Sequence, residues 1–257
     1  MTARSILAAG GLLLAQPVHA ASQYYTVIWT VDPIAASLEE KTVKPGDVIT
    51  EARLLPLSLL TIAHDAVGIE NKIIAPGGMQ MMELQANLRS ACSFTFPRAD
   101  LLERLWSGNQ KFTCLVDEDD DGRFESAFTV MSSHIGIPSS SGKIPNRRTA
   151  INPVSYRRIP LSEGENFPRL LFKYSHQDKI TGHAYFGICI ANSTTRKEPC
   201  FDGYSGVRSD KLPKEIGAAG NLAIATAKQG ALVTLTVKNG FVPMPFKAAE
   251  YVRWVFY

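Results

Sequence analysis

The sequence predicts a mainly β, sandwich-like protein, built as one large or two small disulfide-bridged β modules with at most one or two short helices. Three observations support this fold class. Short runs rich in β-branched and aromatic residues recur along the chain. Clusters of Gly, Pro, Asn and Asp separate these runs at short intervals, as in sandwiches and barrels. The chain also carries four cysteines, an even number that suits disulfide bonds.

Residues 1–20 are typical of a secretory signal peptide. Arg4 gives a positive start, residues 6–15 form a short apolar run, and Val18-His19-Ala20 matches a small-x-small cleavage site. The remaining chain is expected to comprise a β module at 21–135, a linker or long loop at 136–150, and a second β module at 151–257. The signal-like residues 1–20 predict a secreted or periplasmic protein.

The first module is expected to begin with a strand at residues 24–31, which Asp32-Pro33 ends. A Pro-Gly turn at 45–46 leads into a strand at 48–55. Residues 57–63 are expected to form a buried strand, and a helix is the alternative. Residues 92–96 alternate as a half-buried strand does. Leucines spaced at three and four make 98–106 the best helix candidate. Residues 111–116 and 124–131 flank an acidic loop as strands.

The second module has a clearer β composition. Strands are expected at residues 170–174, 185–191, 222–227, 232–238 and 251–257. Spacing favours the pairings Cys92–Cys114 and Cys189–Cys200, although four cysteines allow three pairings. Each such bridge would contribute about 3 kcal/mol by restricting the unfolded chain.

The acidic loop, Asp117-Glu118-Asp119-Asp120-Asp121-Gly122, is the most informative stretch. Asp117, Asp119 and Asp121 alternate before a glycine, which resembles the first half of the DxDxDG calcium loops of EF-hands and of dockerin-like and thrombospondin-like repeats. Alternating carboxylates on a tight turn converge on one point, and calcium prefers six to eight oxygen ligands. The glycine permits the turn.

The resemblance implies two further ligands. Arg123 would give its backbone carbonyl at position seven, and Glu125 stands at position nine, which often binds through water. Position twelve, where a bidentate Glu belongs, is Phe128, and the flanks look like strands. The resemblance therefore covers the loop and implies no EF-hand fold. The alternative is an acidic hairpin turn that binds nothing and is neutralised by Arg123 or by the arginines between 147 and 158.

Composition narrows the function classes. The chain has 27 basic and 24 acidic residues, a balance that predicts no nucleic-acid partner. We expect a non-enzymatic binding or structural protein of the envelope or extracellular space, with calcium as the ion in its loop and a protein or glycan as its partner. One alternative is an exported hydrolase that uses His64 beside Asp65, or His134 beside Ser132 and Ser133, although no nucleophile motif is complete. Another is an outer-membrane-associated β protein, suggested by the aromatic residues at 251–257.

Overall fold

Strands dominate the computed structural model, which describes residues 23–94, 111–131, 137–191 and 200–247. The predicted mainly β fold class is confirmed. Helix in these ranges is limited to two short 3₁₀ turns, η1 (Ile69–Asn71) and η2 (Leu161–Glu163). No helix in the described ranges has the length and apolar character that a membrane crossing requires. The signal peptide, the helix expected at 98–106 and the strand expected at 251–257 lie outside the described residues.

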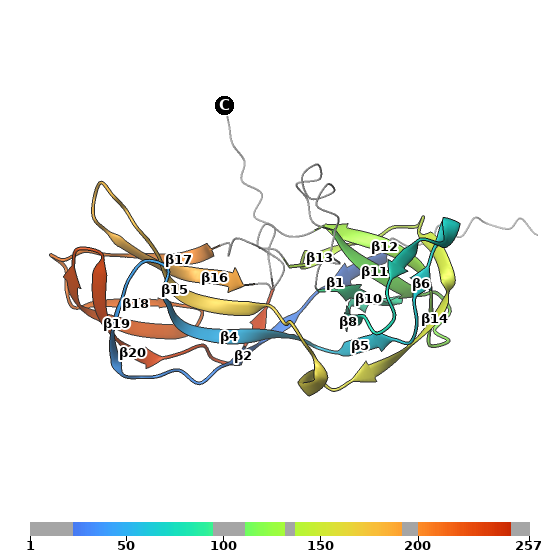
Figure 1. Ribbon diagram of the computed structural model, residues 1–257, viewed down its shortest axis with the longest axis horizontal. Coiled ribbons are helices and arrows are strands. Elements are labelled where there is room, and N and C mark those ends of the chain that lie inside the picture. The colour runs from blue at the N-terminus through green and yellow to red at the C-terminus, as the bar shows by residue number, and fades with distance from the viewer. Residues whose placement is uncertain (1–22, 95–110, 132–136, 192–199, 248–257) are drawn as a thin grey trace, which may run out of the picture.

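One lobe, here called the barrel lobe, is a closed barrel of antiparallel strands (Figure 1). In order around the barrel these are β10 (Arg89–Ser93), β11 (Lys111–Asp117), β12 (Arg123–Met131), β14 (Thr149–Ile159), β5 (Leu59–Ile62) and β8 (Gln80–Glu83). A small sheet beside it contains β13 (Ser141–Ile144), β1 (Gln23–Thr26) and β9 (Gln85–Ala86). The short strands β6 (Ala66–Val67) and β7 (Ile73–Ala75) pair with each other.

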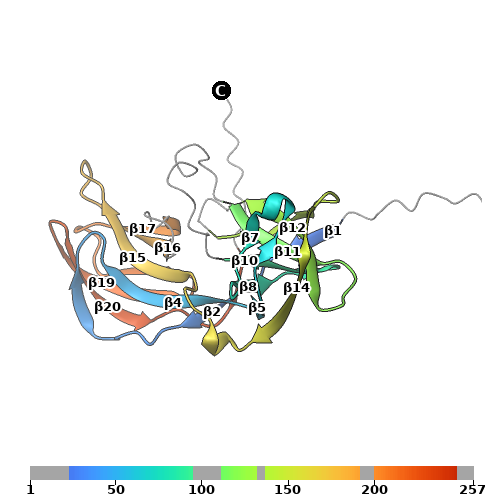
Figure 2. The ribbon, with the colours of Figure 1, turned by 45° about the vertical axis from the view of Figure 1, so that its right-hand side comes forward.

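The other lobe, here called the sandwich lobe, contains two sheets (Figure 2). The first has the order β17 (Cys200–Val207), β16 (Ala184–Ala191), β15 (Arg169–Gln177), β4 (Val48–Pro56), β2 (Trp29–Pro33) and β21 (Pro245–Phe246). The second has the order β18 (Lys214–Ala218), β19 (Asn221–Gln229), β20 (Leu232–Asn239) and β3 (Glu40–Val43). Buried side chains of both sheets belong to one hydrophobic cluster, as a sandwich requires.

The chain passes between the lobes more than once. The single strand expected at residues 24–31 is wrong, because β1 pairs in the barrel lobe and β2 pairs in the sandwich lobe. Of the residues 57–63, for which the sequence left strand and helix open, Leu59–Ile62 form strand β5 and none is helical. Strand β4 pairs with β15 although their residues are more than a hundred positions apart. The predicted division at residues 136–150 stays a prediction, and strand pairing crosses it in both lobes.

Two clusters of buried apolar side chains form the hydrophobic core. The smaller one gathers apolar side chains of the barrel, among them Leu60, Leu115 and Phe124. The larger one fills the sandwich and continues into the barrel lobe, where Trp29 meets Phe94 edge-on at 6.4 Å. Burial of this much apolar surface is the main stabilising contribution to the fold.

Both favoured disulfide pairings are confirmed. Cys92 bonds Cys114 across β10 and β11, and Cys189 bonds Cys200 across β16 and β17. In each case the two cysteines are direct partners in the strand register. Two disulfides indicate an extracellular or otherwise oxidising compartment.

Candidate metal site in the β11–β12 loop

The acidic loop joins the paired strands β11 and β12 in the barrel lobe. Asp117 is the last residue of β11, and the ladder between the two strands resumes at Ser126 opposite Val116. Two residues of the loop have left-handed backbone conformations, Asp120 with φ 62° and Gly122 with φ 89°. Glycine adopts this conformation without strain and Asp tolerates it, so the chain can turn tightly here, as the sequence predicts.

Asp117 is a buried anchor for the loop at the end of β11. Its side chain is 1% exposed, and its carboxylate accepts three hydrogen bonds. Oδ1 accepts from the backbone N–H of Asp121 at 3.1 Å, and Oδ2 accepts from the N–H of Gly122 at 3.0 Å. The Tyr156 hydroxyl also donates to Oδ2, at 2.7 Å. Since a carboxylate has about four acceptor positions, one on Oδ1 stays available to a cation.

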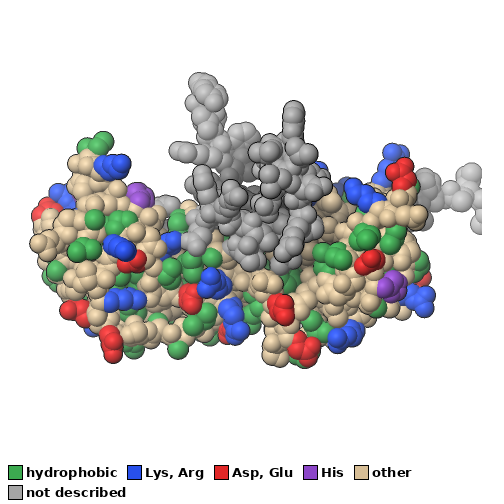
Figure 3. All heavy atoms as spheres, in the orientation of Figure 1, with side chains coloured by type: hydrophobic (Ala, Val, Ile, Leu, Met, Phe, Trp, Pro, Cys, Tyr) green, Lys and Arg blue, Asp and Glu red, His purple; other side chains and the backbone are tan. Residues whose placement is uncertain are grey.

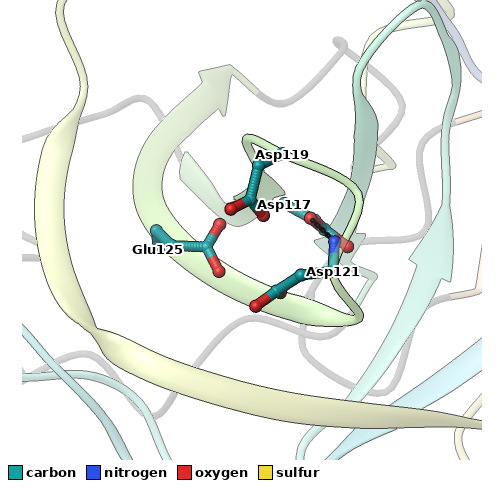
Figure 4. A group of neighbouring side chains, drawn as sticks. All are labelled: Asp117, Asp119, Asp121 and Glu125. Carbon is teal, nitrogen blue, oxygen red and sulfur yellow. Dashed lines mark hydrogen bonds between the residues drawn. The ribbon is translucent and has the colours of Figure 1, made fainter.

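Four carboxyl groups converge at the loop: Asp117, Asp119, Asp121 and Glu125. One ligand oxygen from each lies within 4.8 Å of all the others. Figure 4 shows the four side chains directed toward a common centre from β11, from the loop and from β12. This cluster ranges from buried to exposed and could bind a metal ion.

Backbone donors hold two more of these carboxylates in place. The N–H of Arg123 donates to Asp121 Oδ1 at 2.9 Å, and the N–H of Glu118 donates to Glu125 Oε2 at 2.9 Å. Asp119 makes no hydrogen bond or ion pair with any other residue in the described ranges. Three of the four oxygen donors are therefore preorganised, and the fourth is exposed and free to move.

The other two acids of the run pair with arginines outside the loop. Arg148 donates Nε and Nη2 to the two carboxylate oxygens of Glu118, at 2.9 and 2.7 Å. Arg89 meets Asp120 Oδ1 at 3.0 Å. The alternation of the sequence thus separates two groups: odd-numbered acids face the centre, and even-numbered acids face arginines.

The electrostatics of the loop follow this division. The hydrogen bonds from Arg148 lower the pKa of Glu118. Burial raises the pKa of Glu125, and the charges of Asp117, Asp121 and Asp119 raise it further. Burial and the hydrogen bond to Asp117 raise the pKa of Tyr156 to about 12, so this hydroxyl remains a donor at any ordinary pH. The uncompensated negative charge lies among the four converging carboxylates.

The structure brings together Asp117, Asp119, Asp121 and Glu125 among the residues predicted as ligands. The fifth, Arg123, begins β12 beside the cluster, and its carbonyl as a ligand stays a prediction. Phe128, at the position of the missing bidentate Glu, is a buried core residue opposite Cys114. The sequence predicts Arg123 or the arginines between 147 and 158 as groups that could neutralise the acids. Of the latter, Arg148 forms an ion pair with Glu118.

Sequence reasoning missed Tyr156 and Arg89. Tyr156 lies on β14, where it stacks on Phe124 at 4.2 Å, and Arg89 begins β10 opposite Asp117. Both reach the loop through strand pairing, which no local pattern reveals. A polar aromatic residue beside arginines was the only signal available in the sequence.

The histidine candidates for a hydrolase site are not assembled in the described ranges. His64 is exposed, and its neighbour Asp65 accepts a hydrogen bond from the N–H of Gly77 at 2.7 Å. His134 and its two serines lie outside the described residues. The hydrolase alternative stays a prediction.

Comparison with protein-family models, with curated proteins and with solved structures finds no match to this chain.

Proposed function

We propose that this chain is an exported, non-enzymatic binding or structural protein whose β11–β12 loop holds a calcium ion. The observation that carries the proposal is the convergence of four carboxylates while the neighbouring acids pair with arginines. Like charges held this close repel one another, and a divalent cation among them would remove that cost.

The donor set favours calcium over other ions. All the side-chain donors are carboxylate oxygens, which suit hard cations, whereas zinc prefers nitrogen and sulfur. Calcium–oxygen distances of about 2.3–2.6 Å place opposite ligands about 5 Å apart, which accommodates oxygens that all lie within 4.8 Å. Backbone carbonyls and water would complete a shell of six to eight oxygens.

Export is supported by two features that are independent of the loop. The first twenty residues have the composition of a signal peptide, and the chain contains two disulfide bonds. Extracellular calcium is abundant enough to occupy sites of modest affinity. In this proposal the ion fixes the hairpin end, which would present a surface to a protein or glycan partner.

Thermal unfolding with and without calcium tests the proposal. At a hundredfold excess of calcium over its dissociation constant, the folded state gains about 2.7 kcal/mol. For a chain of this size that gain raises Tm by roughly 5–10 °C. Asp119→Asn should remove most of the rise, because it takes away the one carboxylate that no other described group engages.

Asp120→Asn is the matched control. It makes the same chemical change one residue away, at a side chain that faces Arg89. Asn tolerates the left-handed backbone at this position, so the loop keeps its shape. If calcium leaves Tm unchanged, or if both variants lose the rise equally, the proposed site is wrong. Magnesium in place of calcium should give a smaller rise because it needs a tighter octahedral shell.

A further inference from the structure

Four chain segments meet at the end of the sandwich lobe farthest from the barrel lobe, here called the distal end (Figure 1). They are the turn 44–47, the hairpin tip 178–182, the connection 208–214 and the hairpin tip 228–232. Gln177 Nε2 donates to the carbonyl of Gly230 at 3.1 Å, which joins the two hairpin tips. The N–H of Gly46 donates to the Tyr174 carbonyl at 2.7 Å, and Val207 pairs with Ala184.

The tip of the β15–β16 hairpin projects an aliphatic side chain into solvent. Ile180 is 95% exposed, more than any other large hydrophobic residue of the described ranges. Asp178 Oδ1 accepts the N–H groups of Ile180 and Thr181 at 2.8 and 2.7 Å, and the N–H of Gly182 donates to the Asp178 carbonyl at 2.9 Å. Three hydrogen bonds to Asp178 therefore fix the turn, and Ile180 lies exposed at its tip.

Two more exposed aliphatic residues lie at the same end. Leu232 is 47% exposed at the start of β20, and Val48 is 42% exposed at the start of β4. Single exposed aliphatic side chains are ordinary on protein surfaces. Here three of them share one end of the molecule, and Figure 3 shows hydrophobic and basic side chains together at the projecting hairpin.

The distal end is also basic. Its four segments contain six Lys or Arg residues and three Asp residues, a net charge of +3, which becomes +2 when the exposed Glu215 beside Lys214 is included. Each of the three carboxylates is engaged: Asp47 by the N–H of Lys44, Asp178 by its own turn, and Asp210 by Arg208.

Three lysines of this end have no direct partner among the residues that the structure describes. The Lys44, Lys179 and Lys211 side chains are exposed and make no ion pair or hydrogen bond within the described ranges. Lys and Arg residues therefore outnumber the Asp residues around the aliphatic tips.

We propose that the distal end docks on an anionic phospholipid surface, with Ile180 entering the headgroup region and the surrounding lysines facing lipid phosphates. Exposed aliphatic tips together with exposed lysines suit an interface that is apolar in its interior and negative at its surface. A purely polyanionic partner would have no use for the aliphatic tips. The docking surface and the acidic loop lie in different lobes, so this inference is independent of the calcium site.

Vesicle co-sedimentation tests the proposal, with the full mature chain in EDTA so that calcium cannot bridge protein and lipid. Vesicles of equal parts phosphatidylglycerol and phosphatidylcholine should bind the protein, and phosphatidylcholine alone should bind it much more weakly. Ile180→Ser should lower the partition coefficient about tenfold, because the buried aliphatic area is lost. Lys179→Ser should lower it about fivefold.

The barrel lobe offers a matched control, because Ile69 is 73% exposed there and Lys72 is also exposed. Ile69→Ser and Lys72→Ser should leave vesicle binding unchanged. Three results would overturn the proposal: no binding of the parent chain to anionic vesicles, equal losses in the control variants, or a loss with Lys179→Ser and none with Ile180→Ser. The last would show that lysines adsorb to the charged lipid surface while Ile180 stays outside it.

Discussion

At the scale of single residues, neighbouring acids of one loop have different partners. Asp119 is directed toward three other carboxylates, and Asp120, the next residue, pairs with Arg89. The alternation in the sequence predicts which acids converge, because successive side chains of an extended or tightly turning chain point in different directions. It cannot predict that Arg89 and Tyr156 complete the arrangement, since those residues arrive through long-range pairing.

The ion pair between Glu118 and Arg148 gives a pH-dependent prediction. Because the folded-state pKa of Glu118 lies below the ordinary value of 4.5, the pair stabilises the folded state above that value. The contribution is lost as the pH falls through the lower folded-state pKa. Arg148→Gln should therefore lower the free energy of unfolding by about 1 kcal/mol at neutral pH, since Glu118 is partly exposed to screening solvent.

At about pH 3 the effect of Arg148→Gln should shrink, and urea unfolding at the two pH values measures the difference. A remainder is expected, because Arg148 also donates to the Pro145 carbonyl at 2.8 Å. Arg147→Gln, at an exposed neighbour, is the control and should have little effect at either pH. An Arg148→Gln effect of equal size at both pH values would contradict the assigned ion pair.

At the scale of elements, the candidate site depends on the β11–β12 hairpin and on the disulfide behind it. Cys114 lies three positions before Asp117 on β11, and its bond to Cys92 fixes this strand to β10. The sequence predicts both flanking strands and both disulfide pairings well, because β composition and short cysteine spacings are local signals. The strand expected at residues 24–31 is wrong for the opposite reason: both halves have β composition, and only the tertiary pairing separates β1 from β2.

Removal of the Cys92–Cys114 bond should destabilise the fold and loosen the base of the loop. Replacement of both cysteines with alanine should cost about 3 kcal/mol in urea unfolding, mainly through the unfolded state. It should also reduce the calcium-dependent rise in Tm. The same change at Cys189 and Cys200 is the control: it should destabilise the sandwich lobe and leave the calcium response intact. A calcium response that is equal in both variants would show that the bond does not support the loop.

At the scale of the whole molecule, the two lobes are connected by repeated crossings of the chain. Strands β2 to β4 come early in the sequence and complete the sandwich lobe, whose other strands begin at Arg169. Local composition cannot reveal such pairing, because the register of β4 on β15 depends on residues far apart in the chain. The sequence likewise does not predict the distal end of the sandwich lobe, since only the fold brings its four segments together.

The central claim is that a calcium ion binds among Asp117, Asp119, Asp121 and Glu125. Isothermal titration calorimetry of residues 21–257 with calcium tests it most directly. We expect one ion per chain, with a dissociation constant of about 10⁻⁴–10⁻³ M, as in extracellular modules. Asp119→Asn with Asp121→Asn should abolish the binding heat, and Asp120→Asn should preserve it. No saturable heat from the parent chain, or unchanged binding in the double variant, would contradict the account.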